Sequence, residues 1–128
     1  MPGFPLRPAA LTAVLIALVA TAQAHAQDAA IAAGRNAFGV CRTCHSDVKG
    51  RSGFGPSLYG VAGRKAGSLP GYAYSDAMKA SGIVWDDAAL NAFIAAPRDT
   101  VKGTYMPYAG MKDAGKRAAV IAYLKSLK

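Results

Sequence analysis

Both cysteines of the chain fall within one five-residue segment, Cys41-Arg42-Thr43-Cys44-His45. Two thiols at this spacing can form a redox-active disulfide, supply part of a zinc site, or attach a haem through thioether bonds. The imidazole of His45, directly after the second cysteine, is a further group that can bind a metal. Each of these three kinds of site needs additional residues, so the rest of the chain discriminates between them.

The N-terminus decides how many histidines are available. Residues 1–26 start with a short segment that contains one basic residue, Arg7, continue as an apolar run and end with Ala24-His25-Ala26, which is the pattern of a secretory signal peptide. The apolar run is shorter than the roughly 20 residues of a membrane-spanning helix, so cleavage is expected rather than retention as an anchor. Cleavage after Ala26, or alternatively after Ala24, removes His25. The prediction is a signal peptide over residues 1–26 and one domain over residues 27–128.

The ligands that remain argue against zinc and iron–sulfur sites. A structural zinc site needs about four ligands and an iron–sulfur cluster needs four, whereas this chain offers one cysteine pair and one histidine. A thioredoxin-like site would follow a strand, and the flanking sequence has no β-branched run of that kind. A structural disulfide between Cys41 and Cys44 would close a loop too short to stabilise much. The segment is therefore predicted to attach one c-type haem, with His45 as an iron ligand.

A second axial ligand is expected from a methionine. Met78 lies within a short predicted helix and Met111 comes just before the last predicted helix, so both are interpreted as packing residues. Met106 lies in a loop rich in glycine and proline, and Pro107 restrains the chain beside it. With the haem motif upstream, Met106 is the predicted ligand. A histidine–methionine pair fills both axial positions, which favours electron transfer over binding of a substrate at the iron.

The elements that must position these residues are all helices. Helices are expected over residues 28–40, 75–82, 87–95 and 113–127, and the glycine-rich span 50–71 is expected to be a loop around the cofactor. No strand pattern or internal repeat is present. Because so short a chain with so much loop has little core of its own, the apoprotein is expected to fold poorly.

Several further segments extend the pattern beyond the cysteine motif. They are GPSLYGVAGRKAG (55–67), PGYAYSDAMKASGIVW (70–85), YMPYAGMK (105–112) and IAYLK (121–125). In this order they resemble the class I c-type cytochromes, near the mitochondrial and purple-bacterial soluble branch. The resemblance implies an all-α, class I cytochrome c fold: a small helical domain with long loops wrapped around one haem bound covalently through Cys41 and Cys44. It also implies axial ligation by His45 and Met106.

The resemblance assigns further residues around the cofactor. Pro56 matches the proline whose carbonyl accepts a hydrogen bond from the ligating imidazole. Arg64, Tyr74 and Trp85 match residues that contact or neutralise the haem propionates, and Thr104 matches a loop threonine near a propionate. Ordinary aromatic packing is the alternative role for Tyr74 and Trp85.

Matching positions also describe the packing and the surface. Gly34 and Phe38 match first-helix positions that pack on Val120 and Tyr123, and Tyr108 matches an aromatic beside the exposed haem edge. Several lysines of the mitochondrial members are replaced here. The residues at those positions are Val40, Asp99, Tyr105 and Asp113.

Composition and resemblance together predict a periplasmic one-electron carrier that is a monomer and not an enzyme. The formal charge of +8 is spread along the chain with no nucleic-acid-binding module, so acidic docking surfaces on redox proteins or membrane complexes of a respiratory chain are the expected partners, with only peripheral membrane contact. If Met106 does not ligate, the alternatives are a peroxidase-like haem enzyme or a gas-binding haem protein. A thiol–disulfide protein is a third alternative.

Overall fold

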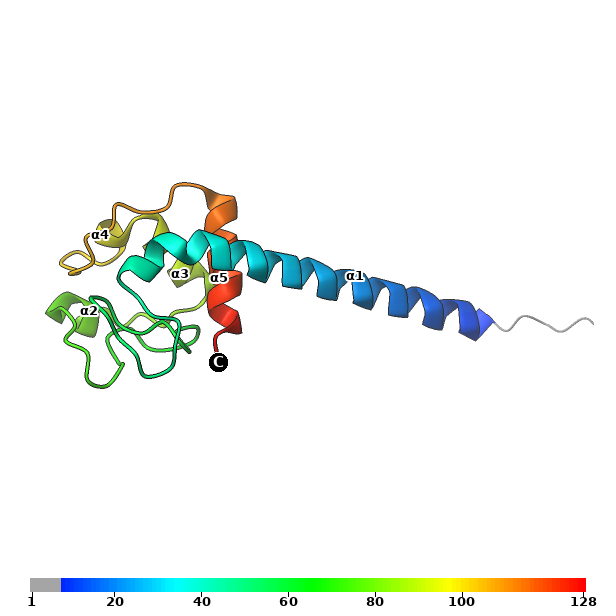
Figure 1. The fold of residues 1–128 in the computed structure, drawn as a ribbon, viewed down its shortest axis with the longest axis horizontal. Coiled ribbons are helices and arrows are strands. Elements are labelled where there is room, and N and C mark those ends of the chain that lie inside the picture. The colour runs from blue at the N-terminus through cyan, green and yellow to red at the C-terminus, as the bar shows by residue number, and fades with distance from the viewer. Residues whose placement is uncertain (1–7) are drawn as a thin grey trace, which may run out of the picture.

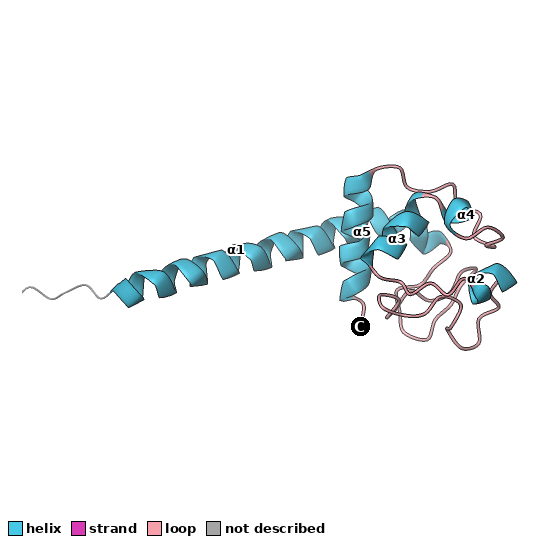
Figure 2. Ribbon diagram, turned by 180° about the vertical axis from the view of Figure 1, so that it is seen from behind, coloured by secondary structure: helices cyan, strands magenta, loops and turns pink. Residues whose placement is uncertain are grey.

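The computed structural model describes residues 8–128, with side chains from residue 13 onward, as a set of helices joined by long loops (Figures 1 and 2). Its elements are α1 (Pro8–Ala37), the 3₁₀ helix η1 (Phe38–Thr43), α2 (Asp76–Ala80), α3 (Asp87–Ala95), α4 (Pro97–Thr100) and α5 (Ala114–Ser126). Across the described residues, β-structure is limited to one isolated antiparallel bridge between Lys65 and Val84. The all-α prediction is confirmed.

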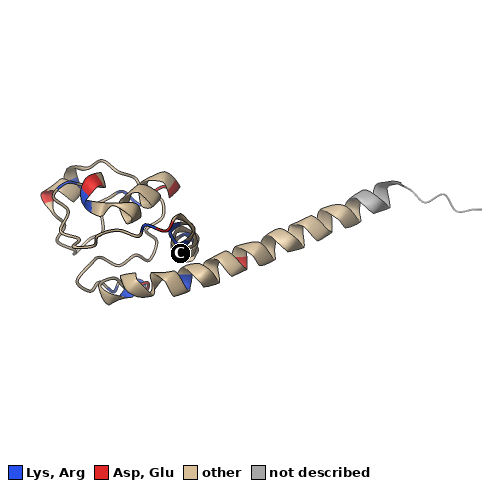
Figure 3. Cartoon of the chain, turned by 90° about the horizontal axis from the view of Figure 1, so that it is seen from above, with Lys and Arg blue, Asp and Glu red and all other residues tan. Residues whose placement is uncertain are grey.

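Helix α1 is much longer than the predicted first helix. Its N-terminal part projects away from the rest of the protein (Figure 1), is exposed over residues 13–29, and carries no charged side chain before Asp28 (Figure 3). The reason is that the alanine-rich leader forms helix readily and contains no residue that stops it. The segment is long and apolar enough to cross a membrane, a property that signal sequences share. The predicted boundary after Ala26 falls within this continuous helix, shortly before its buried part.

The C-terminal part of α1 crosses α5, and this crossing joins the two ends of the domain (Figure 1). Gly34 lies against the main chain of Ala119, which leaves no room for a side chain. Four residues later the fully buried ring of Phe38 contacts Tyr123 with ring centroids 5.4 Å apart. After Ala37 the chain tightens into η1, so the helix predicted to reach residue 40 ends three residues earlier.

Side-chain caps explain where three of the helices begin. At each start a serine or aspartate accepts a hydrogen bond from the backbone N–H three residues further on, which satisfies one of the free donors of the first turn. These pairs are Ser75–Met78 (3.1 Å), Asp86–Ala89 (2.8 Å) and Asp113–Lys116 (2.9 Å). Helix α4 was not predicted: Pro97, expected only to end α3, is also the first residue of α4, where its missing N–H costs nothing.

The hydrophobic core lies between the helices and the inner side of the loops. Met78 and Met111, each 8% exposed, belong to this core, as predicted for packing residues. Trp85 is also buried there, with its ring centroid 5.0 Å from that of Phe93. The loop predicted over residues 50–71 is longer in the structure, where residues 44–75 connect η1 to α2.

Candidate functional site

The cysteine motif forms a tight turn at the end of η1. The backbone N–H groups of Cys44 and His45 both donate to the carbonyl of Cys41, over 3.1 and 2.9 Å. Both thiols are free and partly buried, and burial raises the pKa of Cys41 above its usual range. The turn therefore presents two unpaired sulfur atoms and an imidazole within five residues, as the motif predicts.

The imidazole of His45 is held in one orientation by the backbone of the following loop. Its Nδ1 lies 2.8 Å from the carbonyl oxygen of Pro56. Because a carbonyl can only accept, Nδ1 carries the proton and the lone pair is on Nε2. Burial lowers the pKa of His45, against the opposing effect of the Pro56 carbonyl, so the ring favours the neutral form that binds metals. This hydrogen bond is the one that the resemblance implies for the carbonyl of Pro56.

Gly55 packs directly on the face of the same imidazole. A Cβ atom built at Gly55 would lie 2.5 Å from Cε1 and 2.7 Å from Nδ1 of His45, closer than real carbon contacts allow. The backbone N–H of Gly55 donates to the carbonyl of Cys44 over 2.8 Å, which fixes this approach. The sequence prediction did not include Gly55; its position directly before Pro56 was the available signal.

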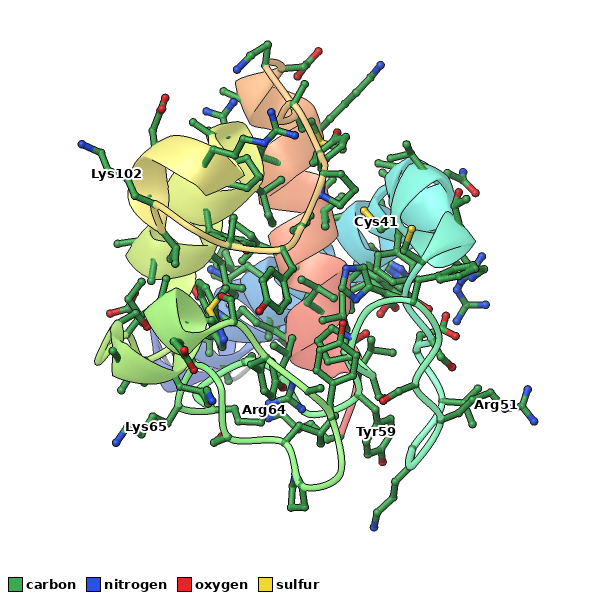
Figure 4. The ribbon with its side chains drawn as sticks, turned by 90° about the vertical axis from the view of Figure 1, so that its left-hand side faces the viewer. Cys41, Arg51, Tyr59, Arg64, Lys65 and Lys102 are labelled. Carbon is green, nitrogen blue, oxygen red and sulfur yellow. The ribbon has the colours of Figure 1, made fainter. Side chains whose placement is uncertain are left out.

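Arg64 places a cation among loops that offer it no carboxylate. Two of its guanidinium nitrogens donate to the carbonyls of Ser57 (3.0 Å) and Tyr59 (3.2 Å). Its Nε is buried and has no partner in the described chain, and Figure 4 shows the side chain lying inside the loops. An unsatisfied buried donor on a cation suits an anionic group of a bound cofactor. Arg64 thus fits the propionate contact that the resemblance implies.

Met106 differs from the other methionines of the described chain. It lies in the extended loop between α4 and α5, is partly exposed, and is not a member of the hydrophobic core that contains Met78 and Met111. Its backbone N–H donates to the Thr104 hydroxyl over 3.3 Å. Thr104 therefore shapes the turn before Met106, a role that the sequence did not suggest.

The far end of the methionine loop is fastened to the end of α3. The backbone N–H of Met111 donates to the carbonyl of Ile94 over 2.8 Å, and Lys112 Nζ donates to the carbonyl of Ala95 over 3.1 Å. From α5, Arg117 donates to the carbonyl of Met111 over 2.9 Å. These bonds were not predicted, and they give the loop a fixed anchor on the helices.

The two aromatic residues assigned by resemblance lie on elements around the loops. Trp85 follows the Lys65–Val84 bridge, and its backbone N–H donates to the carbonyl of Arg64 over 3.0 Å. The ring of Tyr74 is partly buried and meets Tyr72 edge to face, with centroids 4.8 Å apart. These contacts fit ordinary aromatic packing as well as a place beside the cofactor, and Trp85 is tied to Arg64 through the backbone.

A polar cluster connects the cysteine motif to α5. Asp47 Oδ2 accepts from the Tyr123 hydroxyl and pairs with the Arg42 guanidinium, both over 2.6 Å. The Tyr123 hydrogen bond, followed by the Arg42 contact, lowers the pKa of the Asp47 carboxyl. The cluster thereby links residues 76 positions apart and holds the motif against the last helix. It was not predicted from the sequence.

Comparison with known proteins identifies this arrangement. The cytochrome c family profile matches residues 31–128. Over 91 residues the chain is 50% identical to cytochrome c2 iso-2 of Magnetospirillum fulvum, covering 71% of this chain and 95% of that protein. It is 53% identical over 89 residues to cytochrome c2 of Rhodopila globiformis, covering 70% of this chain and 84% of that protein. The structure superposes on cytochrome cH from Methylobacterium extorquens with a TM-score of 0.71 at 47% identity. The match covers 74% of this chain and 96% of that chain.

The chain belongs to the cytochrome c family. Its similarity to the cytochromes c2 puts it in the purple-bacterial branch of the class I c-type cytochromes, and the class I fold is confirmed. It is thus an electron-carrying cytochrome with one haem c attached covalently through Cys41 and Cys44.

Proposed function

We propose that this cytochrome is a periplasmic one-electron carrier whose haem has His45 and Met106 as axial ligands and which catalyses no reaction of its own. The observation that carries the proposal is the contrast among the methionines. Met78 and Met111 are used by the core, whereas Met106 lies on a loop anchored at its far end and outside the core. When bound, the haem supplies a reversible Fe(III)/Fe(II) couple, and a histidine–methionine pair raises its potential.

The residues around the haem keep the two ligands in place while the charge changes. His45 is oriented by the Pro56 carbonyl and confined by Gly55, so its Nε2 stays directed at one position. Arg64 supplies a positive charge for a propionate from a side chain fixed by two carbonyls. A site whose ligands do not move has little to reorganise on electron transfer, which suits a carrier. Tyr74, Trp85 and Thr104 complete the proposed surroundings of the haem.

The proposed cellular location and partners follow from the leader and the charge. Cleavage after Ala26 would release a domain with a formal charge of +7 into the periplasm. A basic carrier is attracted to acidic surfaces, so membrane complexes or redox proteins with acidic docking sites are the proposed partners, with peripheral membrane contact only. The association rate should therefore fall as ionic strength rises. N-terminal sequencing of the exported protein should begin at Gln27.

The axial ligands are tested with a spectrum and a potential. The oxidised wild-type protein should be low-spin with a weak near-infrared sulfur-to-iron band. Met106→Ala should lose this band and lower the reduction potential, whereas the matched control Met78→Leu should keep both, because a methionine-to-leucine change in a core is well tolerated. An unchanged band and potential in Met106→Ala would show that Met106 is not the ligand. High-spin iron in the wild type would favour the peroxidase-like or gas-binding alternatives.

A further inference from the structure

Phe54 is the most exposed of the large hydrophobic side chains between residues 13 and 128, at 89%. Single exposed apolar residues are common on protein surfaces, so the exposure alone has no functional meaning. What distinguishes Phe54 is that its backbone is rigidly held and that it lies beside the haem-binding turn. Both observations follow from the contacts of its two neighbours.

The backbone around Phe54 is held by three hydrogen bonds, one of which ties it to the haem-binding turn. The Gly55 N–H donates to the carbonyl of Cys44 over 2.8 Å, and the Gly53 N–H donates to the carbonyl of Gly55 over 3.0 Å. The carbonyl of Phe54 itself accepts a hydrogen bond from the Tyr72 hydroxyl over 2.6 Å. The ring is therefore held outward from a loop that is already ordered. A partner that binds Phe54 therefore has little loop backbone left to order.

Phe54 and residues of the haem-binding turn line one recess of about 460 Å³. Cys44 and His45 of the turn line this recess together with Arg42 and Arg51. Arg42 is paired with Asp47. Arg51 makes no ion pair with any residue between 13 and 128, and Figure 4 shows it extending away from the protein. The recess therefore combines one exposed aromatic with an unneutralised positive charge.

We propose that Phe54 and Arg51 form a docking site for a redox protein whose contact surface is apolar at its centre and bordered by carboxylates. This inference rests on the proposed electron-carrier function and names the surface through which it acts. Aromatic and arginine side chains are the residues that most often dominate binding energy at interfaces. A partner seated here covers the turn that carries Cys44, so docking brings it next to a haem attachment point. The carboxylates complement Arg51 and the apolar centre covers the Phe54 ring.

The test measures oxidation of the ascorbate-reduced holoprotein by membrane vesicles prepared from the source cells, followed in a stopped-flow spectrometer at several salt concentrations. Phe54→Ser should raise the apparent KM about tenfold, as expected for loss of an interface anchor, and leave the salt dependence unchanged. Arg51→Gln should instead make the rate less dependent on salt. Val84→Ser is the matched control, because Val84 is also exposed, at 51%, but lies at the Lys65 bridge.

The outcomes separate the docking site from the carrier function. A Phe54→Ser protein with the KM of the wild type would refute the docking site and leave the carrier function standing. An equal rise in KM for Val84→Ser would also refute it, because the effect would then be general hydrophobicity. A changed spectrum or slower reduction by ascorbate in Phe54→Ser would show a structural role instead. If the vesicles do not oxidise the wild-type protein at all, the proposed function fails and the docking inference fails with it.

Discussion

Replacing Gly55 by alanine tests whether the loop backbone determines the position of the proposed haem ligand. The added methyl group would lie 2.5–3.0 Å from three atoms of the His45 ring. Gly55 does not have a positive φ, so the backbone itself accepts alanine and the cost is steric. Overpacking typically costs 1–3 kcal/mol, and weakening the His45–Pro56 hydrogen bond adds about 1 kcal/mol. We expect Gly55→Ala to lower the free energy of unfolding by about 2–4 kcal/mol.

Urea titration of the oxidised holoprotein, followed by circular dichroism and haem absorbance, measures this loss. With an m value of about 1–2 kcal/mol/M, the midpoint should fall by at least about 1 M. Gly39→Ala is the matched control: its Cβ would meet no atom within 4 Å, so its stability should stay within about 1 kcal/mol of the wild type. A Gly55→Ala protein as stable as the control, with an unchanged spectrum, would refute the argument that the loop confines His45.

Three further changes test other contacts. Asp47→Asn should lower the free energy of unfolding by about 1–2 kcal/mol at neutral pH, because it weakens the hydrogen bond with Tyr123 and removes the ion pair with Arg42. The folded state lowers the pKa of Asp47, so its stabilisation is fully present above the unfolded-state pKa and is lost as the pH falls through the folded-state pKa. In urea titrations, the stability difference between wild type and variant should therefore begin to shrink below about pH 4 and continue to shrink as the pH falls further. A difference that stays constant would contradict this assignment. Arg64→Leu should lower thermal stability by about 1–3 kcal/mol, measured by calorimetry, because two carbonyls lose their donor; an unchanged melting temperature would show that they find other partners. Gly34→Ala should lower the free energy of unfolding by at least about 2 kcal/mol, because the added methyl group forces α1 away from α5. Amide hydrogen exchange should then be faster in both helices. Exchange rates equal to those of the wild type would contradict this prediction.

Local patterns in the sequence were sufficient to predict most of the helices. Helix α3 was predicted with its observed bounds and α5 to within one residue at each end, because aspartates cap both and their apolar residues repeat at helical spacing. Helix α4 was missed because a proline both ends one helix and begins the next. The first helix was predicted to start too late, because nothing in the leader interrupts the helix. It was also predicted to end three residues too late, because the tightening into η1 leaves no distinct residue pattern.

The proposed ligands could be chosen from residue counts and local sequence, whereas the residues that support them could not. One cysteine pair and one histidine next to it restrict the chemistry, and the loop around Met106 separates it from the core methionines. The contact of Gly55 with His45 depends on how the chain folds back, and the Asp47–Tyr123 bond joins residues 76 positions apart. Such contacts have no local signature, so they required the structure.

The pairing of α1 with α5 has a consequence for the order of events during biosynthesis. Gly34 and Phe38 find their partners only near the C-terminus, so the domain closes when the last segment of the chain becomes available. If the chain is exported N-terminus first, as the proposed signal peptide implies, Cys41 and Cys44 would reach the periplasm before α5. The thiols would then lie on an open chain, accessible for haem attachment, until α5 arrives. Docking of α5 on α1 would end this interval.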